Sequence, residues 1–296
     1  MITLESPLRS SAVPRVSLVL PVHNGANYLA DAIASVVGQS FADFELICVD
    51  DASTDDSLKM LAAAAAADSR IRLICLEQNV GLPAALNHGF KAARGSYYSW
   101  TSDDNLLRAT MLERLVKALD ANPECAIVHS NYSVIDPEGD IIDFVNTNSQ
   151  RGLLMGNHIG ASFLYRREVD IALGGYDTAL FGAEDFDFWL RASAQFRFLH
   201  LAEDLYLYRK HPRSLTNSRA AEIQTLNTNV ILRAVPATMH RKDRTDVLLA
   251  LFRRNFVHLR LDLVLKAFLS APVTTVVQLP SLGWHTLRVI RSRLRG

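Results

Sequence analysis

Hydrophobic positions in the first half of the chain form short apolar runs that alternate with segments of helical periodicity. The apolar runs are near-continuous, as in strands covered on both faces, and they span residues 16–22, 44–49, 71–76, 96–100 and 125–130. The segments between them repeat apolar residues at the three-to-four spacing of helices, and they span residues 28–37, 57–67, 82–93 and 106–119. This alternation predicts an α/β fold around a mostly parallel sheet with right-handed crossovers.

The alternation becomes less regular after residue 131. Residues 136–139 (DPEG) predict a hairpin turn between short strands. The later elements expected are strands at 161–166 and 205–209, with a short helix at 184–194. Beyond residue 214 the pattern is helical, interrupted by prolines, and predicts a helical extension.

Three acidic clusters occupy informative positions in this pattern. They are residues 49–55 (VDDASTD), 101–105 (TSDDN) and 182–185 (GAED), and the first two directly follow predicted strands. Carboxylates at the carboxyl ends of strands line the crevice in which open α/β sheets bind ligands. Together the clusters predict a site for a divalent metal, a nucleotide diphosphate and a general base.

Each cluster considered alone also has a purely structural interpretation. Asp, Asn, Ser and Thr are the preferred N-caps of helices, and acids in a first turn favour the helix dipole. Against this, one or two carboxylates together with substrate phosphates are the usual ligands of Mg²⁺, and Mn²⁺ accepts similar oxygen ligands. The individual clusters leave both interpretations open.

A cationic segment, residues 208–214 (YRKHPRS), follows the last predicted strand. It fits either a solvated edge or diphosphate contacts from Arg209, Arg213 and His211. The chain has no Walker-type phosphate loop, no G-x-G-x-x-G fingerprint and no G-x-S-x-G elbow. These absences disfavour a P-loop NTPase, a classical dinucleotide-binding protein and a serine hydrolase.

The joint order and spacing of these motifs is more specific than any one of them. From about residue 14 to 215 the chain resembles the family-2 inverting glycosyltransferases, which have the nucleotide-sugar-binding GT-A fold. The motifs that carry the resemblance are residues 16–24 (VSLVLPVHN), 39–46 (QSFADFEL), 49–55, 79–81 (NVG) with Asn87, 101–105, 174–177 (GGYD), 184–185 with 189–191 (WLR), and 208–214. The resemblance implies a catalytic domain at 14–215 and a basic helical extension at 216–296.

The resemblance also implies roles for individual residues. Asp185 would be the catalytic base, with Glu184 beside it to bind the acceptor or orient the site. Asp104, Asp103 and His211 would hold Mn²⁺ or Mg²⁺. The nucleotide-sugar site would comprise Pro21, Val22, His23, Asn24, Asp50, Asp51, Asn87, Asp103 and Arg209.

Two positions depart from the family pattern. Thr101 stands where many members have the first acid of the metal motif, and Leu86 precedes Asn87 where an Arg is common. The implied function is transfer of a sugar from a nucleotide-diphosphate donor, with a UDP-sugar expected, to a glycan or lipid-linked hydroxyl. The missing acid leaves a non-catalytic nucleotide- or glycan-binding relative as the alternative. A nucleotidyltransferase is disfavoured because residues 23–26 (HNGA) contain no Lys or Arg.

The net charge of zero conceals an asymmetry between the two ends of the chain. Residues 241–296 carry 11 Lys and Arg against 3 Asp and Glu, a net +8, which leaves −8 for the remainder. A basic, partly apolar tail fits either an ordinary packed helix or peripheral contact with an anionic membrane. Nucleic acid is not expected as a partner, because the tail has few aromatic residues to stack bases.

Compartment signals are sparse. The first 15 residues lack the apolar core of a secretory signal, and no run of about 18 apolar residues predicts a membrane span. Three cysteines without CxxC spacing predict reduced thiols, not a disulfide framework or a zinc site. We therefore expect a cytoplasmic protein, with the cytosolic membrane face as its alternative site of action.

Overall fold

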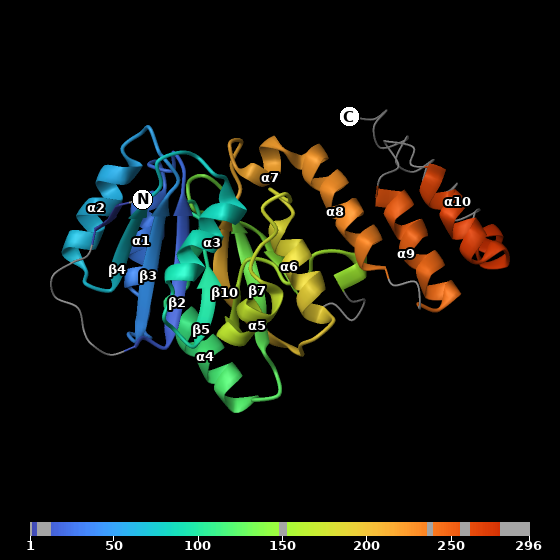
Figure 1. The fold of residues 1–296 in the computed structure, drawn as a ribbon, viewed down its shortest axis with the longest axis horizontal. Coiled ribbons are helices and arrows are strands. Elements are labelled where there is room, and N and C mark those ends of the chain that lie inside the picture. Colours follow the sequence, from blue (N-terminus) through green and yellow to red (C-terminus); the bar gives the residue numbers. More distant parts are fainter. Residues whose placement is uncertain (1, 5–12, 148–152, 236–238, 255–260, 279–296) are drawn as a thin grey trace. The chain divides into compact units, whose positions relative to one another are not determined.

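A computed structural model describes residues 2–4, 13–147, 153–235, 239–254 and 261–278 (Figure 1). The chain divides into two compact units. The first comprises Met1–Gln150 and His158–Arg219, and the second comprises Arg151–Asn157 and Ala220–Gly296. All the site residues expected from the sequence belong to the first unit.

The first unit is built on one mixed sheet. Its strands are β1 (Ile2–Leu4), β2 (Val16–Val22), β3 (Phe44–Asp50), β4 (Ile71–Cys75), β5 (Tyr97–Trp100), β6 (Leu106–Leu107), β7 (Ile127–Ile135), β8 (Ile141–Val145), β9 (Phe163–Arg166) and β10 (Phe198–Arg209). Their order is β1-β4-β3-β2-β5-β9-β7-β10-β6, and β8 pairs with β7. The strands β4, β3, β2 and β5 are parallel, as are β7 and β10, whereas β1, β6, β8 and β9 pair antiparallel.

Helices follow the strands in the predicted alternation. They are α1 (Leu29–Val37), α2 (Ser57–Ala67), α3 (Leu82–Ala92), α4 (Met111–Ala121), α5 (Arg167–Leu173), α6 (Glu184–Ser193) and α7 (Leu215–Ser218). The predicted hairpin turn at 136–139 joins β7 to β8, with Asp136 Oδ1 accepting the amide of Gly139 at 2.9 Å. The α/β class and the parallel central strands agree with the sequence prediction.

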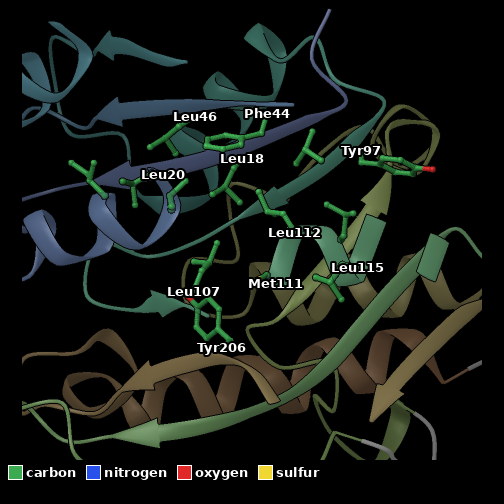
Figure 2. Packing of buried hydrophobic residues seen from close by; sticks show 14 of the residues in the cluster. Leu18, Leu20, Phe44, Leu46, Tyr97, Leu107, Met111, Leu112, Leu115 and Tyr206 are labelled. Carbon is green, nitrogen blue, oxygen red and sulfur yellow. The ribbon is translucent and has the colours of Figure 1, made fainter. Parts of the chain in front are cut away.

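The principal core lies between the sheet and helices α1, α2 and α4. Alternate residues of β2 and β3, among them Leu18, Leu20 and Leu46, meet Leu112 and Leu115 of α4 in this cluster (Figure 2). These side chains are fully buried. Burial of each such Leu contributes about 1.5–3 kcal/mol, so this layer fixes the strands whose ends form the site.

An aromatic cluster involving α3, α6, β5 and β9 forms a second part of the core. Phe90 stacks on Tyr98 at 5.2 Å, and Phe163 meets Trp189 edge-on at 4.8 Å. A Cβ at Gly89 would lie 2.4 Å from Val19 Cγ1, so glycine is needed for α3 to approach β2 this closely. The close approach holds α3 on the strand that leads into the site.

Several element boundaries differ from the sequence prediction, two of them through pairing with distant strands. The helix expected from residue 106 begins at Met111, because Leu106 and Leu107 pair with Leu207 and Tyr206 of β10. The strand expected at 205–209 begins at Phe198, because it pairs with β7 from Ile127 onward. Both differences come from pairing with distant strands, which local periodicity does not report.

The second unit contains the 3₁₀ turn η1 (Leu153–Met155) and helices α8 (Ala220–Ala234), α9 (Arg241–Arg254) and α10 (Leu261–Ser270). Thr245 of α9 contacts α10, with its Oγ1 3.4 Å from the Ala267 carbonyl oxygen. Among the described residues, no helix is both long and apolar enough to cross a bilayer. Four of the basic tail's arginines, 288, 291, 293 and 295, lie outside the described residues.

Candidate active site

A cavity of about 370 Å³ lies where β2 and β3 end. Eight residues expected at the donor or metal site line it: Pro21, Val22, His23, Asn24, Asp51, Asp103, Asp104 and His211. The first acidic cluster, the second acidic cluster and the cationic segment therefore meet in one cavity. The strand-end argument accounts for Asp51, which follows β3 directly.

The loop after β2 is cross-linked to the loop after β3 by side-chain hydrogen bonds. The Nδ1–H of His23 donates to the Asp51 carbonyl at 2.8 Å, and Asn24 Oδ1 accepts the Thr54 amide at 2.8 Å. Asn24 adopts φ +57°, a left-handed conformation that Asn tolerates better than most residues. These bonds hold both loops in place around the mouth of the cavity.

Asp51 positions a third segment as well. Its carboxylate accepts the backbone amides of Val80 at 2.7 Å and Gly81 at 2.9 Å, just before α3 begins. Asp50 lies behind the cavity, and its Oδ2 accepts the Ser53 amide at 3.4 Å. Asp50 thus contacts the loop after β3, and the Asp51 carboxylate contacts the segment before α3. Of the pair, only Asp51 lines the cavity.

Asp103 and Asp104 place two adjacent carboxylates on the cavity wall. Burial, with the charge of Asp104 adding to it, raises the pKa of Asp103 to about 7. Burial also raises the pKa of Asp104, although His211 opposes the shift with its Nε2 3.0 Å from Asp104 Oδ2. Within the described part of the chain, Asp104 Oδ1 is buried without a hydrogen-bond partner.

This donor set fits a hard divalent cation. Two carboxylates whose negative charge is poorly compensated, one with an unpartnered buried oxygen, are oxygen ligands of the kind that Mg²⁺ and Mn²⁺ prefer. No group of three or more His, Cys, Asp or Glu in the described residues is arranged to hold a metal. A cation here would therefore need further ligands from phosphate oxygens or water.

Gly25 controls where the Asp103 carboxylate can lie. A Cβ built on Gly25 would fall 1.9 Å from Asp103 Oδ2 and 2.6 Å from its Cγ. No side chain at position 25 is compatible with this placement of the carboxyl group. The loop after β2 and the metal motif after β5 are thus in direct contact through one glycine.

Arg209 lies behind the metal motif. The residue is 3% exposed, and its guanidinium donates to the backbone carbonyls of Asp104 at 3.0 Å, Asp136 at 3.1 Å and Pro137 at 2.8 Å. It also lies 4.6 Å from the centre of the Tyr28 ring. The sequence predicted a donor contact for Arg209, but the structure places it among backbone carbonyls, while Arg213 lines the cavity.

The remaining donor-site residue expected from sequence, Asn87, also has its side chain engaged by backbone. Its Nδ2 donates to the Tyr176 carbonyl at 2.8 Å and its Oδ1 accepts the Tyr176 amide at 2.9 Å. Leu86 beside it is fully buried in the core. Asn87 thus holds the 174–177 segment, and it does not line the cavity.

Thr101, which replaces an acid of the family pattern, points into the protein. Its Oγ1 lies 2.7 Å from the Tyr206 hydroxyl, and the residue is 1% exposed. The position therefore supplies a buried hydrogen bond under the metal motif. Asp103 and Asp104 line the cavity, whereas Thr101 does not.

The third acidic cluster begins helix α6. Glu184 is buried and accepts the Gly182 amide at 2.5 Å, and burial beside Asp185 raises its pKa well above the usual range. Asp185 is half-buried, and its Oδ1 accepts the Phe186 amide at 2.6 Å. Neither residue lines the 370 Å³ cavity.

Tyr208 connects this cluster with the metal motif electrostatically. Burial raises the pKa of its hydroxyl, a hydrogen bond from Thr216 opposes the rise, and the charges of Asp104 and Asp185 both add to it. Both carboxylates thus act on the same phenol.

Sequence reasoning missed two aromatic residues of the cavity, Tyr28 and Phe181. The ring of Tyr28 lies 5.1 Å from that of His211. Residue 28 was assigned only to the start of a periodic helix, and Phe181 falls in a stretch without periodicity.

Comparisons with known proteins identify the family and the fold. The family model described as "Glycosyl transferase family 2" matches residues 17–174, more than half of the chain. The chain belongs to glycosyltransferase family 2. The matched segment contains the loops after β2, β3 and β5, and therefore the acids of the cavity.

Curated family-2 relatives match over most of this chain but over varying parts of their own length. An uncharacterized glycosyltransferase of Rickettsia typhi is 30% identical over 228 residues, 73% of this chain and 67% of its own. The O-antigen biosynthesis protein RfbC of Myxococcus xanthus is 31% identical over 75% of this chain but only 18% of its own. A Rickettsia bellii relative, also an uncharacterized glycosyltransferase, is likewise matched over only 28% of its length.

Solved structures show the same fold. The S. aureus TarS 1–349 structure with UDP-GlcNAc has a TM-score of 0.65 at 19% identity, covering 90% of this chain and 80% of that one. The mannosyltransferase PcManGT of Pyrobaculum calidifontis, in complex with GDP-Man and Mn²⁺, has a TM-score of 0.64 at 18% identity, covering 96% and 81%. The family-2 chain thus has the GT-A fold expected from its sequence.

Proposed function

We propose that the protein is an inverting glycosyltransferase that moves a sugar from a nucleoside-diphosphate donor, a UDP-sugar, to a glycan or lipid-linked hydroxyl. The observation that carries this proposal is the cavity itself. Asp51, Asp103, Asp104 and His211 converge there from three loops, with Arg213 on the same wall. Acids for a cation and cations for a diphosphate are the groups that such a donor requires.

The residues around the cavity would have distinct binding roles. Asp51 and the loop of Pro21 to Asn24 would bind the nucleoside, and Arg213 would contact the diphosphate. Asp103 and Asp104 would hold Mn²⁺ or Mg²⁺, with His211 fixing Asp104. When bound, the cation would supply charge stabilisation for the departing diphosphate.

Asp185 would act as the general base. It would accept the proton of an acceptor hydroxyl, whose oxygen then forms a bond to the anomeric carbon. The bond from that carbon to the diphosphate oxygen breaks on the opposite face, which inverts the configuration. Burial raises the pKa of Glu184 and so disfavours its charged form, which is why the role of base is assigned to Asp185.

The choice of donor and acceptor rests on similarity. TarS has been solved with UDP-GlcNAc and PcManGT with GDP-Man, which supports a nucleotide-sugar partner. The name of RfbC refers to O-antigen biosynthesis, which supports a surface glycan or its lipid-linked precursor as acceptor. Such an acceptor would place the protein in the cytoplasm, with the net charge of +8 on residues 241–296 favouring contact with an anionic membrane.

A thermal-shift panel of nucleotides and nucleotide sugars, with and without Mn²⁺, tests the donor proposal. A ligand that binds only the folded state raises the melting temperature by mass action. We expect a shift with UDP or one UDP-sugar that is larger when Mn²⁺ is present. Absence of a shift with every nucleotide would contradict the proposal and favour a non-catalytic relative.

A further inference from the structure

A second cavity, of about 470 Å³, adjoins the donor cavity. It lies between the β7–β8 hairpin and the segment that follows β10, and its walls include Tyr132, Asp143, Tyr208 and Lys210. Ser214 lines both cavities, so the two spaces share a wall. The proposed function assigns no role to this second space.

Two tyrosine rings form a fixed wall of the second cavity. Their centres are 6.1 Å apart, and the Tyr208 hydroxyl is 2.8 Å from Thr216 Oγ1. The Tyr132 ring packs on the backbone of Gly160, where a Cβ would lie only 2.5 Å from Cε1 and φ is +72°. Both rings are half-buried, so they are held in place and still present surface to a ligand.

The charged groups of this cavity are balanced. Asp143 contributes one negative charge and Lys210 one positive charge. Lys210 is exposed and forms no ion pair with any residue in the described part of the chain. A phosphate would be repelled by Asp143, and an acyl chain would form no hydrogen bond with either charged group. A neutral ring bearing several hydroxyls satisfies both groups and can lie against the tyrosines.

The second cavity is also linked electrostatically to the proposed base. Burial raises the pKa of Tyr132 to about 12, and the charges of Tyr208, Asp185 and Asp143 add to that rise. Asp185 therefore acts on Tyr132 as well as on Tyr208. A ligand seated against these rings would lie next to the donor cavity, with which this space shares Ser214.

We propose that the second cavity is the acceptor subsite, and that it holds one uncharged pyranose unit between the two tyrosines, Asp143 and Lys210. The proposal rests on the proposed function, because it makes this sugar the source of the attacking hydroxyl. Asp143 accepts a hydrogen bond from a sugar hydroxyl and Lys210 donates one. The acceptor is thus selected by neutral polar contacts, whereas the donor is selected by charge.

Fluorine NMR of the whole chain labelled with 3-fluorotyrosine tests the assignment. Tyr28, Tyr132 and Tyr208 signals are identified with the three corresponding Tyr→Phe variants. The probes are methyl glycosides of glucose, galactose, mannose, N-acetylglucosamine, N-acetylgalactosamine and rhamnose, added with and without UDP and Mn²⁺. We expect at least one glycoside to shift the Tyr132 and Tyr208 signals but not that of Tyr28, and UDP to shift Tyr28.

Variants then separate the subsite from general effects. Asp143→Ala and Lys210→Ala should each weaken binding of the responding glycoside about 3–10-fold, the loss typical of one hydrogen bond, without changing the Tyr28 response to UDP. Asp140→Ala, an exposed acid of the neighbouring turn, is the matched control and should change neither response.

Three results can be told apart. If no glycoside moves the Tyr132 or Tyr208 signal, or if the shifts survive both variants, the acceptor subsite is refuted. If Tyr28 does not respond to UDP, the donor proposal fails instead. The glycoside titration without nucleotide still decides whether the second cavity binds sugar.

Discussion

The acid pairs Asp103–Asp104 and Glu184–Asp185 look alike in sequence but differ in their surroundings. Each contains a carboxyl group whose pKa is raised by burial beside its neighbour's charge. The first pair lines a cavity, with His211 on one carboxylate. Glu184 is instead bonded by the Gly182 amide at the start of a helix. The difference teaches that an acid pair indicates a cation site only where its oxygens face open space.

Of the changes considered, removal of the proposed base should have the largest effect, and the quantity affected is turnover. Asp185→Asn keeps the size of the side chain but cannot accept the acceptor's proton, so turnover should fall about 10²–10⁴-fold. Binding of UDP should be unchanged, because Asp185 does not line the donor cavity. Turnover is measured by UDP release and binding by thermal shift. Near-normal turnover would show that the second pair has no catalytic role.

Loss of the proposed cation ligand, Asp104, should have the next largest effect. Asp104→Asn removes the carboxylate charge that His211 contacts, and the Mn²⁺-dependent part of the UDP thermal shift should disappear. Asp31→Asn, an exposed acid in the first turn of α1, is the control and should retain the full Mn²⁺ response. An equal Mn²⁺ response in the Asp104 variant would place the cation elsewhere.

Arg209→Lys tests whether the Asp103–Asp104 pair is held in place by Arg209, which donates to the Asp104 carbonyl from another part of the chain. Lysine keeps the charge but cannot reproduce the guanidinium geometry that reaches the carbonyls of Asp104, Asp136 and Pro137. We expect a loss of about 2 kcal/mol in the free energy of unfolding, and a higher Mn²⁺ concentration for half-maximal activity. Arg114→Lys, in a more exposed ion pair with Glu203, should lower the free energy of unfolding less than Arg209→Lys does, because solvent screens the exposed pair. Similar losses in the two variants would remove the structural argument for Arg209.

Glu184→Gln should change stability by a similar amount, and only over part of the pH range. A carboxyl whose folded pKa is raised stabilises the fold below its unfolded pKa, and this contribution is lost as pH rises through the folded pKa. Between pH 5 and 8 the natural protein should therefore lose about 1–3 kcal/mol that the Gln variant keeps. Urea unfolding across this range measures the difference. Glu168→Gln, an exposed acid in the first turn of α5, should follow the natural protein, and the same behaviour in Glu184→Gln would contradict the burial argument.

The sequence was most informative where one local pattern determines the structure. The buried strand at 16–22 and the helix at 57–67 have the predicted limits, because apolar runs and helix formers specify them locally. The short strand β6 was missed because Leu106 and Leu107 acquire their strand structure only by pairing with β10. Long-range pairing of this kind has no counterpart in a short window of sequence.

Some residues of the candidate site could likewise be placed from the sequence, and others could not. Acids that directly follow strands, such as Asp51, could be placed from the pattern alone. Arg209 could not, because a cation after a strand gives no indication of whether its guanidinium meets solvent or buried carbonyls. Tyr132 and Tyr208 come together only through the pairing of β7 with β10, which links residues far apart in the chain. Their positions required the three-dimensional structure.

The contact between Gly25 and Asp103 has an evolutionary consequence. Two positions 78 residues apart occupy one volume, because the carboxyl oxygen lies where a methyl group at position 25 would be. Among homologous chains, a larger residue at position 25 is compatible only with a shorter or redirected residue at position 103. Substitutions at these two sites should therefore be inherited as pairs.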